Sequence, residues 1–326
     1  MKSKILEILR NKDTYVSGQE LSERFGVSRT AVWKAIHQLE EEGYRIEAVP
    51  RKGYHMVETP DVVCKEEILS LLETKWAGRN LVYLETVDST NDLAKKLADP
   101  GAPEGTLVVA DEQTGGKGRR GRAWCTPKGS AIAMTIVLRP DIRPELASMV
   151  TLVMGLSVAK AIGSLYPVSV GIKWPNDVVV NGKKICGILT EMSAEMTGIH
   201  YLVIGTGINT NVEEFPEEIQ SVATSLIKEL GEKVNRAELI AACLKYFEEY
   251  YEKYIAAGNL APLKEDYEAL LLNRNNKVRV LEPNHEYTGL SLGINEDGEL
   301  LVEKEDGTVT AVYAGEVSVR GVYGYV

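Results

Sequence analysis

The chain has 326 residues, of which 44% are hydrophobic and 26% are charged, and its formal net charge is −10. This length allows two or three domains, and the composition is that of an ordinary soluble protein. The negative balance excludes a general polyanion binder, so any contact with nucleic acid requires a local basic surface.

The cysteine pattern and the apolar patterning exclude several further classes. The four cysteines are far apart and form no C-x-x-C pair, which argues against a structural zinc site or a disulfide framework. The first residues lack the apolar run of a signal peptide, and no uninterrupted apolar stretch is long enough to span a membrane. Residues 146–166 come closest, but they include Ser, Thr and Lys and are interpreted as a buried helix. We therefore expect a cytoplasmic protein with no membrane partner.

The first sixty residues predict three helices in close succession. An apolar stripe over residues 3–10 indicates the first helix. Ser17 and Glu20 form a capping box for the second helix, which ends at Gly26, and Ser28 caps the third. Two helices joined by a glycine turn are typical of a helix-turn-helix.

A hairpin follows, with strands expected at residues 44–49 and 54–57 and two cations in the turn between them, as in the wing of a winged helix. The acids nearby gather in residues 40–42, whereas the outer face of the third helix and the wing tip carry none. We therefore expect residues 1–60 to bind DNA, and the alternative is a small helical domain with a solvated charged face. The contacts expected toward the major groove are Arg29, Thr30, Trp33, Lys34 and His37, and those expected toward phosphate are Arg51 and Lys52.

A glycine-rich, cationic loop follows an expected strand at residues 106–110. The loop spans residues 113–124, and Gly116, Gly118 and Gly121 match the pattern G-x-G-x-x-G. A dinucleotide site, however, requires a helix directly after these glycines. Here Pro127 and Gly129 interrupt any helix, and residues 131–138 look like another strand. Glycine permits close backbone approach and arginine binds phosphate in bidentate fashion, so we expect the loop to close over an anion. The alternative is a disordered surface loop.

A second polar cluster precedes a predicted hairpin. Asn181-Gly182 is a strong turn signal between apolar runs at residues 178–180 and 185–189. A further strand at residues 201–204 leads into Gly205-Thr206-Gly207-Ile208-Asn209. With helices expected near residues 65–75, 91–98 and 146–166, this pattern predicts a mixed α/β domain on an antiparallel sheet, entered through a linker at residues 58–64.

The C-terminal part changes from helices, within residues 237–272, to short strands separated by turns. Asp297-Gly298 and Asp306-Gly307 are hairpin turn signals. The pattern predicts a small SH3-like barrel over residues 273–326. Its strands are expected at residues 277–281, 286–294, 300–304, 309–313 and 317–320.

Five motifs together resemble the family of bifunctional biotin–protein ligases and biotin operon repressors. They are DSTND (88–92), GKGRRGRAW (116–124), KWPND (173–177), KKICGIL (183–189) and GTGINTN (205–211). The resemblance covers the whole chain and implies an α+β multidomain protein. Its parts would be an N-terminal winged helix-turn-helix (1–60), a class II synthetase-like mixed α/β ligase domain (65–272) and a C-terminal SH3-like β-barrel (273–326). One departure is Lys117, where the family loop often has Arg.

The resemblance implies a two-step reaction. Biotin and ATP, with Mg²⁺ on the triphosphate, would give biotinyl-5′-AMP, and a lysine of a carrier protein would then take the biotin. The implied carriers are the biotin carboxyl carrier protein of acetyl-CoA carboxylase and those of other biotin-dependent carboxylases. Biotinyl-5′-AMP would also act as corepressor, stabilising a homodimer that binds the biotin operator DNA.

The resemblance also assigns site residues, and we assign none of them as a dedicated metal ligand. Ser89, Thr90 and Gln113 would contact the biotin ring, although residues 88–91 could simply cap the following helix. Lys184 would bind the biotin carboxylate and the α-phosphate, Trp124 would pack against adenine, and Asn209 would lie near the nucleotide. The catalytic residues would be Lys184, Arg119 and Asp177, the last with a role in metal binding, in receiving the lysine or in organising the hairpin. The full implied substrate site is Ser89, Thr90, Asn91, Gln113, Lys117, Gly118, Arg119, Arg120, Arg122, Trp124, Lys184, Gly187 and Asn209.

The sequence leaves three alternatives open. A biotin sensor without chemistry would not need the phosphate-neutralising cations. A lipoate-type ligase with a DNA-binding domain would share the fold, but the GKGRRGRAW loop favours biotin. A ligase with a purely structural winged helix would not need the cationic helix face.

Overall fold

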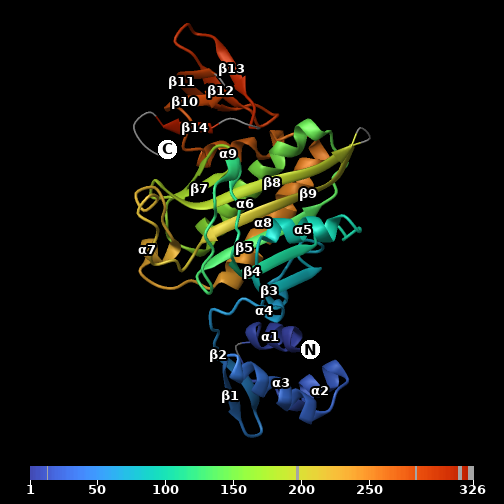
Figure 1. The fold of residues 1–326 in the computed structure, drawn as a ribbon. Coiled ribbons are helices and arrows are strands. Elements are labelled where there is room, and N and C mark those ends of the chain that lie inside the picture. Colours follow the sequence, from blue (N-terminus) through green and yellow to red (C-terminus); the bar gives the residue numbers. More distant parts are fainter. Residues whose placement is uncertain (13, 196–197, 283–284, 315–317, 322–326) are drawn as a thin grey trace. The chain divides into compact units, whose positions relative to one another are not determined.

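The computed structural model describes residues 1–12, 14–195, 198–282, 285–314 and 318–321 (Figure 1). The chain forms two compact units. The first comprises Met1–Leu72 and Asn235–Ala241, and the second comprises Glu73–Val234 and Ala242–Val326.

The first unit contains the predicted winged helix-turn-helix. Ser17 caps α2 by accepting a hydrogen bond from the Glu20 amide at 3.0 Å, and α2 ends at Gly26 in the left-handed conformation (φ 62°). Ser28 caps α3 in the same way, and β1 and β2 pair antiparallel to form the wing. The elements are α1 (Lys2–Arg10), α2 (Gly18–Phe25), α3 (Arg29–Glu41), β1 (Arg45–Val49), β2 (Gly53–Glu58) and α4 (Lys65–Leu71).

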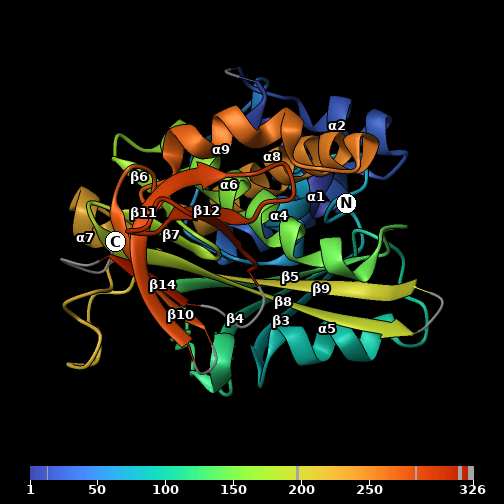
Figure 2. The ribbon, with the colours of Figure 1, turned by 90° about the horizontal axis from the view of Figure 1, so that it is seen from above.

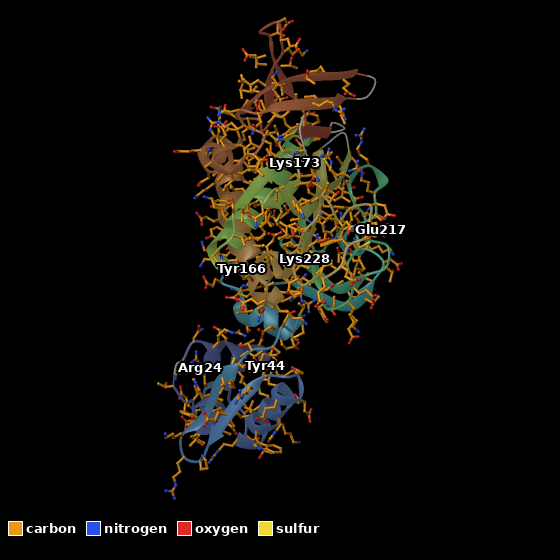
Figure 3. The ribbon with its side chains drawn as sticks, turned by 90° about the vertical axis from the view of Figure 1, so that its left-hand side faces the viewer. Arg24, Tyr44, Tyr166, Lys173, Glu217 and Lys228 are labelled. Atoms are coloured by element: carbon orange, nitrogen blue, oxygen red, sulfur yellow. The ribbon has the colours of Figure 1, made fainter. Side chains whose placement is uncertain are left out.

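The helix α4 belongs to this unit, although we placed its residues at the start of the catalytic domain. Its Glu67 is fully buried and accepts hydrogen bonds from Arg10 Nη2 at 2.7 Å and from the Tyr44 hydroxyl at 2.6 Å (Tyr44 is labelled in Figure 3). A buried carboxylate requires such partners, because an unpaired one would be strongly destabilising. Burial, together with the hydrogen bond to Glu67, raises the pKa of Tyr44 above its ordinary value. Asp61, in the expected linker, forms an ion pair with Arg236 at 2.9 Å within the same unit.

The second unit is built on a seven-stranded sheet in the order β3-β4-β5-β9-β8-β7-β6. The expected antiparallel sheet is mixed, because β3, which we did not predict, pairs parallel with β4 through the crossover helix α5 (Thr90–Ala98). The expected strand at residues 201–204 is also longer and includes the whole GTGIN stretch. The strands are β3 (Leu81–Val87), β4 (Leu107–Gln113), β5 (Ala131–Leu138), β6 (Val170–Lys173), β7 (Asp177–Val180), β8 (Lys183–Glu195) and β9 (Gly198–Asn209).

Helices cover both faces of this sheet (Figure 2). The helix α5 packs on one face, against β4, β5 and β9, while α6 (Ala147–Leu165) packs on the other face with α8 (Arg236–Ala257) and α9 (Lys264–Leu270). The stretch Pro144–Leu165 is apolar and long enough to cross a membrane, but 78% of its most apolar window is buried in the protein. It is therefore the buried helix that we expected. A short helix, α7 (Leu226–Leu230), follows β9.

The C-terminal residues form a separate five-stranded antiparallel sheet in the order β13-β12-β11-β10-β14. Gly298 (φ 72°) and Gly307 (φ 80°) take the left-handed conformation that the predicted turns require. All five predicted strands are present, although Val317 lies outside the described residues. The strands are β10 (Lys277–Glu282), β11 (His285–Ile294), β12 (Leu300–Glu303), β13 (Val309–Val312) and β14 (Ser318–Gly321).

The fully buried Trp174 ties this sheet to the larger one. Its indole Nε1 donates a hydrogen bond to the Gly298 carbonyl at 3.0 Å, and its amide donates to Asn273 Oδ1 at 2.8 Å. The Trp of KWPND is therefore structural, whereas the residues after it reach the site described next.

Candidate active site

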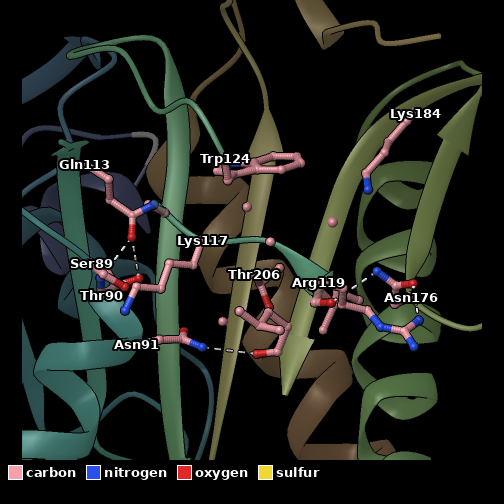
Figure 4. A pocket seen from close by; sticks show the side chains of 17 residues that line it. Ser89, Thr90, Asn91, Gln113, Lys117, Arg119, Trp124, Asn176, Lys184 and Thr206 are labelled. Carbon is pink, nitrogen blue, oxygen red and sulfur yellow. Dashed lines mark hydrogen bonds between the residues drawn. The ribbon is translucent and has the colours of Figure 1, made fainter. Parts of the chain in front are cut away.

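A pocket lies between the N-terminus of α5, the end of β4, the glycine-rich loop and the strands β8 and β9 (Figure 4), and together with the solvent space at its mouth it has a volume of about 460 Å³. It brings together ten of the thirteen residues expected to bind substrate. The lining residues are Ser89, Thr90, Asn91, Gln113, Lys117, Gly118, Arg119, Trp124, Ala133, Asn176, Lys184, Gly187, Ile188, Leu189, Gly205, Thr206 and Gly207.

The floor of the pocket is a patch of sheet without side chains. Gly187 of β8 pairs with Gly207 of β9, and Gly205 lies two residues away on the same face. A Cβ at Gly207 would lie 2.3 Å from Trp124 Nε1, and one at Gly205 would lie 2.1 Å from Asn91 Oδ1. The missing side chains at Gly187 and Gly207 therefore allow the Trp124 indole to lie directly on the backbone of the strands, and the one at Gly205 leaves room for Asn91 (Figure 4).

One wall is a network of neutral polar groups. Gln113 Oε1 accepts from the Thr90 amide at 2.8 Å and from its hydroxyl at 3.0 Å, and Gln113 Nε2 donates to Thr126. The Thr135 hydroxyl lies 2.8 Å from Thr90 Oγ1 and 2.7 Å from Asn91 Oδ1. Because it has a single proton, it can donate to only one of these two oxygens at a time. This wall offers directional donors and acceptors but no charge, which suits a polar, uncharged ring.

Ser89 of the DSTND motif serves both roles considered for it, as a helix cap and as a residue of the binding site. Its hydroxyl caps α5 by accepting from the Asp92 amide at 3.4 Å, and the residue also lines the pocket. The cap is therefore part of the pocket wall.

The other wall carries the cation that we expected to be essential. Lys184 Nζ lies 2.5 Å from Asp177 Oδ1 and 5.6 Å from the centre of the Trp124 ring. Asp177 is not among the lining residues, but it also accepts from Asn176 Nδ2 at 3.1 Å. Asp177 therefore acts on the pocket through Lys184, and an anionic ligand would compete with it for this ammonium group.

The loop cations are also engaged. Arg119 donates to Asn176 Oδ1 at 2.9 Å and to the Ala314 carbonyl at 2.8 Å, and burial lowers its pKa below the ordinary value, although it stays charged at neutral pH. Lys117 Nζ lies 2.6 Å from Asp92, and this hydrogen bond lowers the pKa of the Asp92 carboxyl. Two carboxylates thus hold pocket cations that an anion would otherwise bind.

Three of the residues expected to bind substrate lie elsewhere. Asn209 is buried and donates to the Thr224 carbonyl, so its amide supports the strand end and does not line the pocket. Arg120, in the left-handed conformation (φ 58°), lines a neighbouring open groove, and Arg122 is exposed on the loop. The loop turns between Lys117 and Trp124, so its successive cations cannot all point into one pocket.

Two pocket residues to which we assigned no role carry a clear signal. Asn176 lies beside both Arg119 and Asp177, and the Thr206 hydroxyl, like Trp124 Nε1, is buried with no hydrogen-bond partner among the described residues. Buried polar groups normally have partners, so these atoms are suited to polar groups of a ligand. Both residues belong to quoted motifs, KWPND and GTGINTN, but a single sequence does not distinguish lining positions from supporting ones.

In the first unit, all seven residues expected to contact DNA are exposed. One expectation was wrong, because an acid does reach this face. Glu40 Oε2 lies 2.7 Å from His37 Nδ1, since the two residues are one helical turn apart on α3.

Comparison with known proteins identifies three family regions in this order. Residues 2–55 match an HTH domain, residues 83–209 match the biotin/lipoate A/B protein ligase family, and residues 275–320 match the biotin protein ligase C terminal domain. The chain is 41% identical to the bifunctional ligase/repressor BirA of Bacillus subtilis over 93% of both chains. The chain belongs to the bifunctional biotin ligase/repressor family.

A second bifunctional ligase/repressor and a solved ligase structure support this assignment. The Escherichia coli bifunctional ligase/repressor is 31% identical and covers 97% of this chain and 96% of its own. A biotin protein ligase from Aquifex aeolicus, solved in complex with biotin and ATP, is 34% identical with a TM-score of 0.66, covering 74% of this chain and 99% of its own. The predicted order of winged helix, ligase domain and C-terminal sheet is confirmed, and the boundaries at residues 60, 65, 272 and 273 stay predictions.

Proposed function

We propose that this chain is an ATP-dependent biotin–protein ligase that also represses transcription in response to biotin. The observation that carries the proposal is Lys184, held in a pocket with a bare glycine floor and a neutral polar wall, within a chain that belongs to the ligase/repressor family. Such a pocket suits a ligand with an uncharged polar ring at one end and an anionic group at the other.

The reaction has two steps, and neither needs a nucleophile from the enzyme. A carboxylate oxygen of biotin attacks the α-phosphorus of ATP, pyrophosphate leaves, and biotinyl-5′-AMP forms. The amine of a carrier lysine then attacks the acyl carbon, loses a proton and displaces AMP, which leaves an amide. The enzyme aligns two anions and neutralises the charge that develops on phosphate.

The pocket suggests how these tasks are divided. Thr90 and Gln113 are proposed to bind the biotin ring, and Lys184 to leave Asp177 and bind the carboxylate and the α-phosphate together. Arg119 is proposed to neutralise the phosphates. Trp124, whose indole nitrogen has no partner among the described residues, is proposed to pack against adenine.

Mg²⁺ is proposed to arrive on the phosphates of ATP. Among the described residues, no group of three or more His, Cys, Asp or Glu side chains could hold a metal ion. Mg²⁺ usually needs only one or two protein carboxylates in addition to substrate phosphates. Asp177 is the carboxylate best placed to serve, since Lys184 would leave it when an anion binds.

The remaining partners follow from the same proposal. The lysine acceptor is proposed to be the biotin carboxyl carrier protein of acetyl-CoA carboxylase or of a similar carboxylase, in the cytoplasm. Biotinyl-5′-AMP is proposed as corepressor for a homodimer that binds operator DNA through the winged helix.

A strand edge supports the homodimer. Among the described strands, β8 pairs with β7 only as far as Gly187, whereas residues 189–195 pair with β9 alone. An open edge can pair with a second copy of itself. Sedimentation with and without biotin and ATP would test whether the dimer forms only on a filled site.

The decisive experiment is biotin-dependent exchange between ATP and pyrophosphate. We expect exchange in the wild type, its collapse in Lys184→Ala, and little change in Lys183→Ala. Lys183 is the matched control, because it is an exposed lysine one position earlier on β8. Exchange driven by lipoate in place of biotin would contradict the substrate, and a folded wild type that binds biotin without any exchange would leave only a sensor.

A further inference from the structure

The outward face of α3 carries an unusually exposed aromatic side chain. Trp33 is 51% exposed, whereas Val32, Ala35, Ile36 and Leu39 on the same helix are buried in the core. The indole stands among the other exposed residues of the face that we expect to contact DNA, so its apolar surface is available to a partner there.

The Trp33 indole is held in place before any partner arrives. The His37 ring lies one turn further along α3 and meets it edge to face, with ring centroids 4.0 Å apart and planes at 70°. His37 is in turn fixed by Glu40, whose carboxylate lies 2.7 Å from Nδ1. Positions 33, 37 and 40 share one face of the helix, so the three side chains form a row that orients the indole.

The surroundings of Trp33 indicate that the partner is duplex DNA. Arg29 and Lys34 flank the row on α3, and Arg51 and Lys52 are exposed at the wing. Cations on both elements could contact the phosphate backbones of the two DNA strands. Glu40, in contrast, places a carboxylate beside His37 in this row, so the row itself is suited to a base edge and not to phosphate.

An indole offers an apolar surface and a single donor, and no acceptor. The apolar feature of base edges in the major groove is the C5-methyl group of thymine. We infer that Trp33 recognises a thymine in each half-site through this methyl group, with His37 and Glu40 as positioning residues. This inference rests on the proposed repressor function and deepens it by naming the base that α3 reads.

The test uses the full chain supplied with biotin and ATP, and duplexes selected from a random library by the wild type. Each thymine of the selected site is then replaced by deoxyuridine, which removes only the methyl group. We expect one position in each half-site at which this replacement weakens wild-type binding about fourfold, the ratio for burying one methyl group. In Trp33→Ala that ratio is expected to fall to about one, and His37→Ala should lower it part of the way.

Lys34→Ala is the matched control, because it removes a neighbouring exposed side chain that contacts phosphate in this proposal. It should weaken binding equally on thymine and uracil duplexes and lower the salt dependence of binding. The exposure of Trp33 and Lys34 means that neither change should alter thermal unfolding.

Three results would overturn the inference. If the wild type enriches no sequence from the library, both the repressor proposal and this inference fail. If it enriches a site but Trp33→Ala keeps the same thymine-to-uracil ratio, only this inference fails. If Trp33→Ala leaves every DNA affinity unchanged, the exposed indole serves a different partner and the inference fails as well.

Discussion

Gly207→Ala should test directly whether the bare strand is the floor of the active site. The added Cβ would lie 2.3 Å from Trp124 Nε1 and 2.4 Å from Cε2, whereas ordinary contacts begin near 3.4 Å. The indole must therefore move by about 1 Å, a displacement that can cost about 100-fold in rate when it misplaces a reacting group. That loss corresponds to about 2.7 kcal/mol of transition-state stabilisation.

The fold itself should tolerate the change. Gly207 has no left-handed φ, and the clashing group is a side chain on a loop and not the backbone of the sheet. We expect the free energy of unfolding to change by less than about 1 kcal/mol, the low end for overpacking, because the indole can yield. Gly163→Ala on α6 is the control, since its Cβ meets nothing within 4 Å and alanine favours the helix.

The assay is biotin-dependent ATP–pyrophosphate exchange, combined with thermal unfolding. A double-mutant cycle isolates the cause: in a Trp124→Ala background, Gly207→Ala should cost less than about twofold, because the clashing ring is gone. An exchange rate within threefold of wild type for Gly207→Ala alone would refute the placement of Trp124 on the floor. An equal loss in both backgrounds would show that the effect passes through the strand.

Three further predictions concern the polar contacts. Asp92→Asn releases Lys117 for substrate anions and should lower the KM for ATP severalfold at low salt. The free energy of unfolding should change by less than about 1 kcal/mol, because the ion pair is partly exposed. An unchanged KM would argue against competition between Asp92 and ATP for Lys117. Tyr44→Phe leaves the buried Glu67 with one donor fewer and should lower the free energy of unfolding in urea by about 1–3 kcal/mol. Because the pKa of Tyr44 is raised on folding, the folded state retains a proton that the unfolded state releases above pH of about 10, so the wild type should lose stability as pH rises beyond that value, and Tyr44→Phe should lose less. Trp174→Phe removes the donor to the Gly298 carbonyl and leaves a gap beside it. Calorimetry should show that the free energy of unfolding falls by about 1–3 kcal/mol. An unchanged melting temperature would mean that the contact between the two sheets does not depend on this indole.

The parts of the fold that could be predicted from sequence depend on local chemistry. Ser17, Gly26 and Ser28 delimit their helices through contacts within a few residues, and Asn181-Gly182 takes the left-handed angles that a tight hairpin needs. The strand β3 could not be found in this way, because its partner β4 lies across a helix and pairs parallel. The strand β9 was predicted to end too early, at residue 204, because Gly205 and Gly207 follow it. Glycine is unfavourable in strands unless another group must approach the backbone closely, as Trp124 does here.

The same distinction holds for the candidate site. The cations of the loop and Lys184 were evident because their charges cluster in sequence. The carboxylate that restrains Lys117 was not, since Asp92 lies in a different motif and meets it only in the folded chain. The absence of Asn209 from the pocket has a similar origin, because its partner, the Thr224 carbonyl, comes from a segment without any sequence signal.

The composition of the first unit has a consequence for synthesis on the ribosome. Its chain is interrupted: residues up to Leu72 are joined by Asn235–Ala241, where Arg236 forms an ion pair with Asp61. At about 5–20 residues per second, the missing piece emerges roughly 8–35 s after α4 does. During that interval the nascent winged helix lacks Arg236, which forms an ion pair with Asp61 in the folded unit. The DNA-binding unit of a new molecule is thus completed only after β9 has been made, so a chain that stops before residue 235 carries neither a finished ligase nor a finished repressor.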